Sequence, residues 1–207
     1  MQILGYGEDA LTLWALQNKL PEILERLDDA SDPATCRAFF RPSFGRRGGD
    51  ERSEFGEFDF ILLAAEYLYL GESKWDGSSE VIVDGKLELR AEQLLRHDLF
   101  KFYVREWAFG HYLDWQEFEH QAEPKLTQVG ITKPIARAGS KLARNLAAIL
   151  AVIRKQYATL PAIKNVLLYL HAGGAVSRLP HAAGRDFTVV PIDYSDDVSG
   201  SFIQLSL

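Results

Sequence analysis

Asp59, Glu72 and Lys74 could together assist the hydrolysis of a phosphodiester bond. Carboxylate oxygens held on a rigid support are the ligands that Mg²⁺ uses in proteins, with water and substrate phosphate at the remaining positions. A lysine beside such an ion can orient a water molecule and offset the negative charge that builds up on a phosphoryl group. This chemistry requires the three side chains to lie close together, although they are separated along the chain.

A β-hairpin predicted over residues 56–75 would bring these charges together. Two runs rich in aliphatic and aromatic residues flank a central pair of turn residues, which is typical of two strands joined by a tight connection. If the strands pair symmetrically about that turn, Asp59 lies opposite Glu72, and Glu57 lies opposite Lys74, with all four on one face. Two carboxylates that close repel each other unless a cation lies between them.

Charge on a solvated strand face is the alternative interpretation of these residues. The hairpin is apolar on both sides, with Ile61 and Leu63 on the face of the charges and Phe60 and Leu62 on the other. A hairpin of this kind belongs in the middle of a sheet covered by helices. Charges at its end lie at the mouth of a buried layer, where burial without a role is unfavourable, so we favour the functional interpretation.

With these residues the chain resembles the PD-(D/E)XK nuclease superfamily, whose members share the restriction-endonuclease-like fold. The matching residues are Asp59, a second strand that ends in Gly71-Glu72-Ser73-Lys74, and a following helix that carries Gln93. The resemblance covers residues 5–103. It departs from the superfamily pattern at one point, because Phe58 rather than Pro precedes Asp59.

The resemblance implies roles for the same residues. Asp59 and Glu72 would hold a divalent metal, Mg²⁺ or Mn²⁺, and Lys74 would assist the attacking water. Gln93, on the predicted helix, would help to orient the lysine, the water or a DNA phosphate. A plain solvent-exposed helix face is the alternative for Gln93.

Many members of the superfamily also place a glutamate on the first helix as an accessory ligand of metal or water. Glu8, Glu22 and Glu25 are the candidates, since residues 8–27 are predicted to be helical. We favour Glu8, because the preceding Gly5-Tyr6-Gly7 could present it close to a backbone-lined site. The alternative for Glu8 is helix stabilisation, since negative charge in a first turn complements the helix dipole.

Basic residues bear on whether nucleic acid could bind. The net charge of −6 is unusual for a DNA enzyme, since phosphate binding favours a basic footprint. A segment rich in Gly and Arg before the candidate site could nevertheless lie along a nucleic-acid backbone, and a flexible surface loop is the alternative. The arginines expected to contact phosphate are Arg41, Arg46, Arg47 and Arg52.

Length and composition favour a single domain over residues 1–207, located in the cytoplasm, and the resemblance implies that this domain is nuclease-like. The hydrophobic content of 47% and the charged content of 25% are ordinary for a soluble globular protein. The single cysteine, Cys36, cannot form an internal disulfide, which fits a reducing compartment. The N-terminus lacks the features of a secretion signal, and no apolar run approaches the roughly 18 residues of a membrane span.

The predicted fold is α/β, with a mixed central β-sheet flanked by helices in the restriction-endonuclease-like arrangement. Hydrophobic periodicity predicts helices at 8–27, 88–108 and 135–157, and strands outside the hairpin at 36–40, 81–83, 166–170, 187–192 and 202–207. The residues around 107–118 predict a packed aromatic helix or loop rather than a metal site.

These observations predict a metal-dependent nuclease that hydrolyses phosphodiester bonds in nucleic acid, with DNA as the favoured substrate. Two hypotheses from other classes stay open. One is a catalytically inactive nuclease-fold protein that acts as a nucleic-acid-binding or interaction module, and the other is an enzyme acting on a small phosphorylated substrate. A homodimer is compatible with the sequence, since nucleases that cut both strands of a duplex are commonly dimers.

Overall fold

Two compact units make up the chain. The computed structural model describes residues 3–45, 52–77, 82–174, 179–184, 186–199 and 202–205. The sheet unit comprises Met1–Arg41, Phe58–Leu89 and Ile163–Leu207, and the helical unit comprises Pro42–Glu57 and Arg90–Ala162. The single nuclease-like domain over residues 1–207 stays a prediction.

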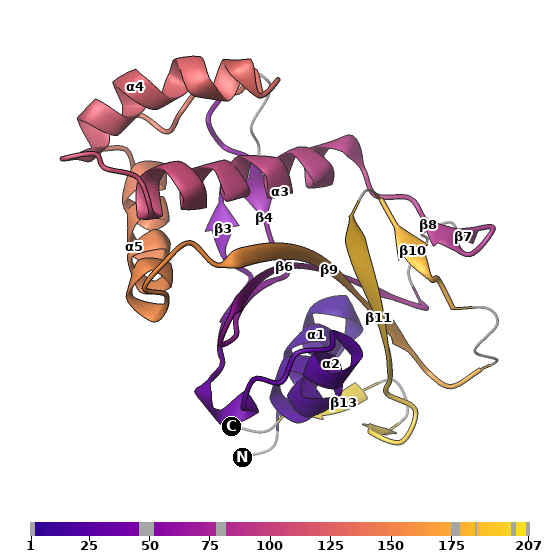
Figure 1. The fold of residues 1–207 in the computed structure, drawn as a ribbon. Coiled ribbons are helices and arrows are strands. Elements are labelled where there is room, and N and C mark those ends of the chain that lie inside the picture. Colours follow the sequence, from indigo (N-terminus) through magenta and orange to yellow (C-terminus); the bar gives the residue numbers. More distant parts are fainter. Residues whose placement is uncertain are drawn as a thin grey trace. The chain divides into compact units, whose positions relative to one another are not determined.

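A mixed β-sheet forms the centre of the sheet unit (Figure 1). Within the described residues its five longer strands lie in the order in which they occur in the chain: β2 (Arg37–Phe40), β5 (Phe60–Leu63), β6 (Tyr67–Trp75), β9 (Ala162–His171) and β11 (Phe187–Asp193). Two-residue strands extend the sheet beyond β11, in the order β10 (Ala182–Ala183), β8 (Lys86–Leu87) and β7 (Ile82–Val83). All four residues of β5 are buried, as expected of an inner strand that is covered on both faces.

The strand directions show why this sheet is mixed. Strands β2, β5 and β6 are antiparallel neighbours, whereas β9 and β11 are parallel. Strands β6 and β9 also run in the same direction, because Lys164 near the start of β9 lies over the ring of Tyr67, the first residue of β6. At the other end, the Asp76 N–H donates to the Leu170 carbonyl. The predicted α/β class, with a mixed central sheet flanked by helices, is confirmed.

Helices α1 (Gly7–Asn18) and α2 (Leu20–Arg26) lie together against one face of this sheet (Figure 1). Pro21 lies in the first turn of α2, where its missing N–H costs no hydrogen bond, so the helix predicted over residues 8–27 consists of two helices. Trp14 of α1 packs in one core cluster with the strand residues Phe60 and Tyr69. The helix pair therefore covers the even-numbered side of β5 and the odd-numbered side of β6.

A smaller antiparallel sheet adjoins the start of α1. It consists of β1 (Ile3–Gly5), β13 (Phe202–Leu205) and β12 (Val198–Ser199), with Leu4 paired to Gln204. A short 3₁₀ helix, Pro33–Thr35, precedes β2. The link between β1 and α1 is the single residue Tyr6, so this small sheet sets where the first helix begins.

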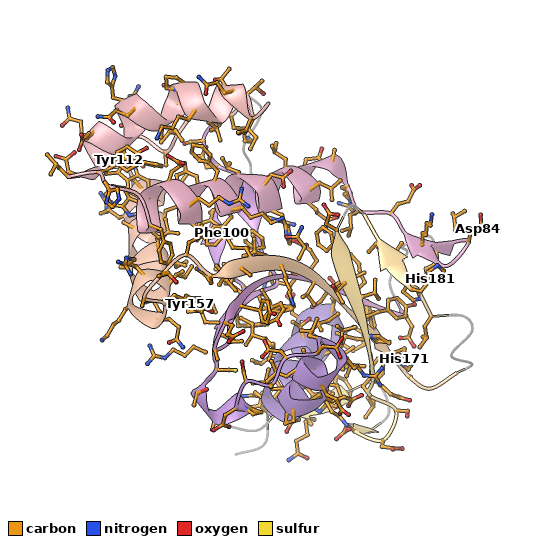
Figure 2. All side chains as sticks on the ribbon, viewed as in Figure 1. Asp84, Phe100, Tyr112, Tyr157, His171 and His181 are labelled. Atoms are coloured by element: carbon orange, nitrogen blue, oxygen red, sulfur yellow. The ribbon has the colours of Figure 1, made fainter. Side chains whose placement is uncertain are left out.

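The helical unit surrounds an aromatic core. It holds α3 (Ala91–Tyr103), α4 (Trp115–Gln128), α5 (Lys141–Gln156), and the two-stranded sheet of β3 (Ser43–Phe44) and β4 (Gly56–Glu57). A π-helical segment, Val104–Ala108, continues α3. Phe100 of α3 is fully buried and packs against Phe44 at a ring-centroid distance of 5.2 Å (Figure 2).

The predicted register of the central hairpin is confirmed. Residues Phe60–Leu63 pair with Leu68–Gly71 as expected, and the Ala64 N–H donates to the Tyr67 carbonyl at 3.0 Å to close the turn. The strand starts at residue 60 rather than 56, so Asp59 lies just outside it.

The predicted pairing of Glu57 with Lys74 is wrong. Glu57 lies in β4 and pairs with Ser43, in the helical unit. The chain leaves the line of the hairpin at Phe58 and Asp59, which lie between β4 and β5. The predicted first strand is therefore two strands, which belong to different sheets.

Two predicted helix boundaries also differ. The helix predicted from residue 135 begins at Lys141, because the Ser140 side chain accepts a hydrogen bond from the Ala143 N–H at 3.0 Å and caps it there. The helix predicted over 88–108 begins at Ala91 and becomes π-helical from Val104. Across the described ranges, every helix is too short or too polar to cross a membrane.

Candidate active site at the end of the central hairpin

Asp59 is held at the end of the sheet by contacts on both sides. Its Oδ2 accepts a hydrogen bond from the backbone N–H of Ser73 in β6, with 2.7 Å between the atoms. Its carbonyl oxygen accepts a hydrogen bond from the Arg41 N–H, at 3.0 Å, which continues the β2–β5 ladder. The position of this carboxylate is therefore fixed by backbone atoms of two neighbouring strands.

Glu72 and Lys74 lie in the last part of β6. Glu72 is only 1% exposed, and Lys74 is half-buried. Because strand side chains alternate, Glu72 and Lys74 share one face, while Ser73 between them faces the other side. The structure thus brings Asp59, Glu72 and Lys74 to one end of the hairpin.

The carboxylates of Asp59 and Glu72 repel each other at the end of the hairpin. Burial and the neighbouring Glu72 carboxylate raise the pKa of Asp59 from 3.8 to about 7. The Glu8 carboxylate adds to this rise, while the Ser73 N–H and the Lys74 ammonium oppose it. Carboxylates that share a buried site cannot all ionise without a penalty, and a cation between them would remove it.

Glu8 reaches this cluster from the first turn of α1. Its Oε1 lies 3.6 Å from Nζ of Lys74, and both side chains are half-buried. Glu22 of α2 is engaged elsewhere, since its Oε1 lies 2.9 Å from the guanidinium of Arg26 one turn along the same helix. Of these two candidate glutamates, Glu8 is therefore the one with a contact in the site.

Arg41 lies beside the cluster but is paired. Its side chain forms an ion pair with Asp9, the residue that follows Glu8 in α1. Its backbone has a positive φ of 49°, an uncommon conformation for a residue with a side chain. Arg41 therefore links the first helix to the strand pair that carries Asp59, a structural role that exists alongside its predicted contact with phosphate.

Gln93 and Arg52, two of the remaining predicted residues, belong to the helical unit. The Gln93 side-chain oxygen accepts a hydrogen bond from the Arg90 N–H at 3.1 Å and so caps the start of α3. Arg52 is exposed, and its carbonyl accepts a hydrogen bond from Nζ of Lys133 at 3.0 Å. Arg46 and Arg47 lie outside the described residues. The roles expected of these four residues stay predictions.

The oxygen donors at this position suit a hard cation. Mg²⁺ and Mn²⁺ prefer carboxylate oxygens, which Asp59 and Glu72 supply. In the described part of the chain, no group of three or more His, Cys, Asp and Glu side chains could hold a metal ion by itself. Mg²⁺ commonly takes one or two carboxylates and fills its other positions with water and substrate phosphate, so the pair fits a metal that binds together with substrate.

Two features of this region are not predicted from the sequence. Asp9 is one, because its ion pair with Arg41 depends on how α1 packs against the sheet. The other is the aromatic pair of Tyr6 and Trp75, whose rings lie 6.0 Å apart and which are close in sequence to Glu8 and Lys74. The succession Gly-Tyr-Gly-Glu and the Trp that follows Glu-x-Lys are the sequence signals that could have indicated it.

Comparison with known proteins identifies no relative of the chain. No protein-family model, curated protein or solved structure matches the chain. The resemblance to the PD-(D/E)XK superfamily therefore stays a hypothesis.

Proposed function

We propose that the chain is a metal-dependent nuclease that hydrolyses phosphodiester bonds in nucleic acid, with DNA as its substrate. The observation that carries this proposal is the pair of carboxylates, Asp59 and Glu72, crowded at a buried strand end beside Lys74. Such a pair is unfavourable for the fold by itself, so its presence favours a bound cation. Membership of the PD-(D/E)XK superfamily is part of the same proposal.

The carboxylates have the role of metal ligands. Asp59 and Glu72 would hold Mg²⁺ or Mn²⁺, which when bound polarises a phosphate oxygen and lowers the pKa of water. The 2.7 Å hydrogen bond from the Ser73 N–H fixes the orientation of the Asp59 carboxylate before any ligand arrives. Burial does the same for Glu72. This rigidity reduces the reorganisation that binding requires.

Lys74 has the role of orienting water and offsetting charge. During hydrolysis a water oxygen bonds to phosphorus, the bond from phosphorus to the leaving oxygen breaks, and the transferred group carries spread negative charge. The Lys74 ammonium lies on the face of the carboxylates, where it can compensate that charge. Glu8, 3.6 Å from Lys74 Nζ, restrains the lysine as a positioning residue.

An inactive nucleic-acid-binding module is the second candidate. The net charge of −6 and the pairing of Arg41 with Asp9 favour it over an enzyme with a strongly basic groove. The presence of all three residues of the Asp, Glu and Lys set favours the enzyme, because a module that only binds has no need of the repulsion at Asp59.

Cleavage with and without metal tests the proposal. The purified chain is incubated with linear duplex, circular and single-stranded DNA in Mg²⁺, Mn²⁺ or EDTA, beside Lys74→Ala. Lys125→Ala is the matched control, since Lys125 in the helical unit is also ion-paired, with Nζ 2.7 Å from Glu106. We expect metal-dependent cleavage that falls on the order of 100-fold in Lys74→Ala and persists in Lys125→Ala.

Two results would contradict the proposal. The first is cleavage of equal rate in Lys74→Ala and the wild-type chain, which would move the chemistry to other residues. The second is binding of DNA without turnover in any metal, which would support the inactive module instead.

A further inference from the structure

An aromatic pocket of about 390 Å³ lies in the sheet unit, and sequence neighbours of Glu8 and Lys74 contribute to its lining. Tyr6 and Gly7, which directly precede Glu8, form one wall, and Trp75, which directly follows Lys74, forms another. The two elements that bring charged groups to the site therefore also build this pocket. The volume falls in the range of small-molecule sites and suits one planar heterocycle.

Exposed aromatic faces surround the opening. Tyr6 is 64% exposed, and its ring lies 6.0 Å from the Trp75 ring at an interplanar angle of 82°. Phe202 of β13 is 48% exposed, and its ring lies 6.1 Å from that of Tyr6. Large aromatic side chains gathered at a hollow surface are the platforms on which unpaired bases stack.

The walls of the pocket are held in place. A Cβ on Gly77 would lie 2.8 Å from the Trp75 indole, so the chain there packs directly on the ring. The Tyr194 hydroxyl donates to the Asp76 carboxylate, which fixes the opposite wall to the end of β6. His171, labelled in Figure 2, marks the end of β9, and Ala172 after it lines the pocket. A preformed pocket of this kind binds with little loss of side-chain entropy.

Charge decides which part of a nucleotide fits. None of the described residues that line the pocket is Lys or Arg. The carboxylates of Asp76 and Asp193 support its rim, where Asp193 accepts the Ser195 N–H at 2.8 Å. A phosphate is therefore disfavoured inside the pocket, while an uncharged aromatic ring is favoured. The cation nearest in sequence is Lys74, on the side of the carboxylates.

We infer that this pocket binds one nucleobase of the substrate strand. The inference rests on the proposed function and adds the substrate class to it. A base enters such a pocket only when it is not paired, so the substrate is single-stranded or locally unpaired nucleic acid. Tyr6 and Trp75 are the stacking residues.

Binding in EDTA tests this inference apart from cleavage. Fluorescence anisotropy compares labelled oligothymidine with an oligonucleotide of equal length whose bases are replaced by abasic sites, which keeps the phosphate charge. The variants are Tyr6→Ala, Tyr6→Phe, and the control Leu113→Ala at a position that is 93% exposed in the helical unit. We expect Tyr6→Ala to weaken binding of oligothymidine about tenfold, and Tyr6→Phe to stay within about twofold of wild type. Binding of the abasic strand should not change.

The outcomes separate the two proposals. Equal affinity of the wild-type chain for both strands would overturn the inference, as would a Tyr6→Ala effect of equal size on both. If either binding result were found together with metal-dependent cleavage, the proposed nuclease function would be retained and the base pocket would be rejected. If binding depended on the bases but no metal supported cleavage, the nuclease proposal would be rejected and the pocket would be the binding site of an inactive module.

Discussion

Each unit of the protein contains a polar cluster built around one lysine, and the two clusters differ in their charge balance. In the helical unit, Glu106 accepts hydrogen bonds from Lys125 at 2.7 Å and from Tyr112 at 2.9 Å. Burial raises the pKa of Glu106, but these hydrogen bonds outweigh it, and the net pKa is lowered. In the sheet unit, burial and Glu72 raise the pKa of Asp59 to about 7.

The difference shows which cluster is complete without a ligand. In the helical-unit cluster (Glu106, Tyr112 and Lys125) one carboxylate meets one ammonium group, and a hydroxyl completes the network. In the sheet-unit cluster (Glu8, Asp59, Glu72 and Lys74) the carboxylates outnumber the lysine. The first arrangement is a surface ion pair of modest value, whereas the second gains from an added cation.

The largest expected effect is a loss of cleavage when a glutamate of the sheet-unit cluster is replaced by glutamine, compared with the same substitution in the helical-unit cluster. Glu72→Gln removes a metal ligand, and we expect nucleic-acid cleavage to fall on the order of 100-fold or more. Glu106→Gln should leave the cleavage rate unchanged. Single-turnover rates in Mg²⁺ at saturating protein measure both. A comparable loss in the two variants would show that the comparison between the clusters is wrong.

The second prediction concerns the pH dependence of stability in EDTA. The folded protein holds the Asp59 proton more tightly than the unfolded chain, whose aspartates titrate near pH 4. The free energy of unfolding should therefore fall by about 1.4 kcal/mol per pH unit between about pH 4 and pH 7 for this one proton. The added stability is fully present below that window and is lost as the pH rises through it. Urea unfolding of the wild-type chain and Asp59→Asn isolates the effect as a difference.

The helical-unit cluster should give the opposite sign. The pKa of Glu106 is lowered in the folded state, so its contribution to stability is present above its ordinary pKa and is lost as the pH falls. The difference in unfolding free energy between the wild-type chain and Glu106→Gln should therefore grow with pH. Parallel slopes for Asp59→Asn and Glu106→Gln would contradict the assignment of opposite shifts.

The parts of this site that are local in sequence are predictable, and the parts set by packing are not. The register of β5 and β6 follows from two apolar runs and a tight turn, and it places Glu72 and Lys74 on one face. The break between Glu57 and Phe60 is not visible in that pattern, because Glu57 pairs with Ser43 and accepts a hydrogen bond from the Arg96 side chain, both distant in sequence. The contact of Glu8 with Lys74 likewise depends on how α1 packs.

The same distinction between local signals and packing applies to the elements of the fold. Alternation and helical periodicity predict most strands and helices of the described chain, since these signals arise within each segment. The pairs β1–β13 and β3–β4 consist of short strands that are separated along the chain, so their pairing is not set within either segment. For this reason the pocket wall at Tyr6 becomes evident only when β1 and β13 are seen side by side.

The smallest expected effect is a change in the free energy of unfolding when one serine in each unit is replaced by alanine. Ser73 lies between Glu72 and Lys74, and its Oγ is buried with no hydrogen-bond partner in the described part of the chain. Ser140 of the helical unit accepts the Ala143 N–H at 3.0 Å and caps α5. Ser73→Ala should raise the free energy of unfolding by about 1 kcal/mol, because it removes an unsatisfied hydroxyl, and Ser140→Ala should lower it by about 1 kcal/mol.

Urea unfolding of both serine variants at one pH, in EDTA, measures these shifts directly. The same chemical change then has opposite signs, since the helical unit uses its hydroxyl for folding and the sheet unit does not. If Ser73→Ala also destabilises the chain, the Ser73 hydroxyl has a partner in solution. The end of β6 would then be satisfied in the absence of ligand, and the contrast between the two clusters would be confined to their charges.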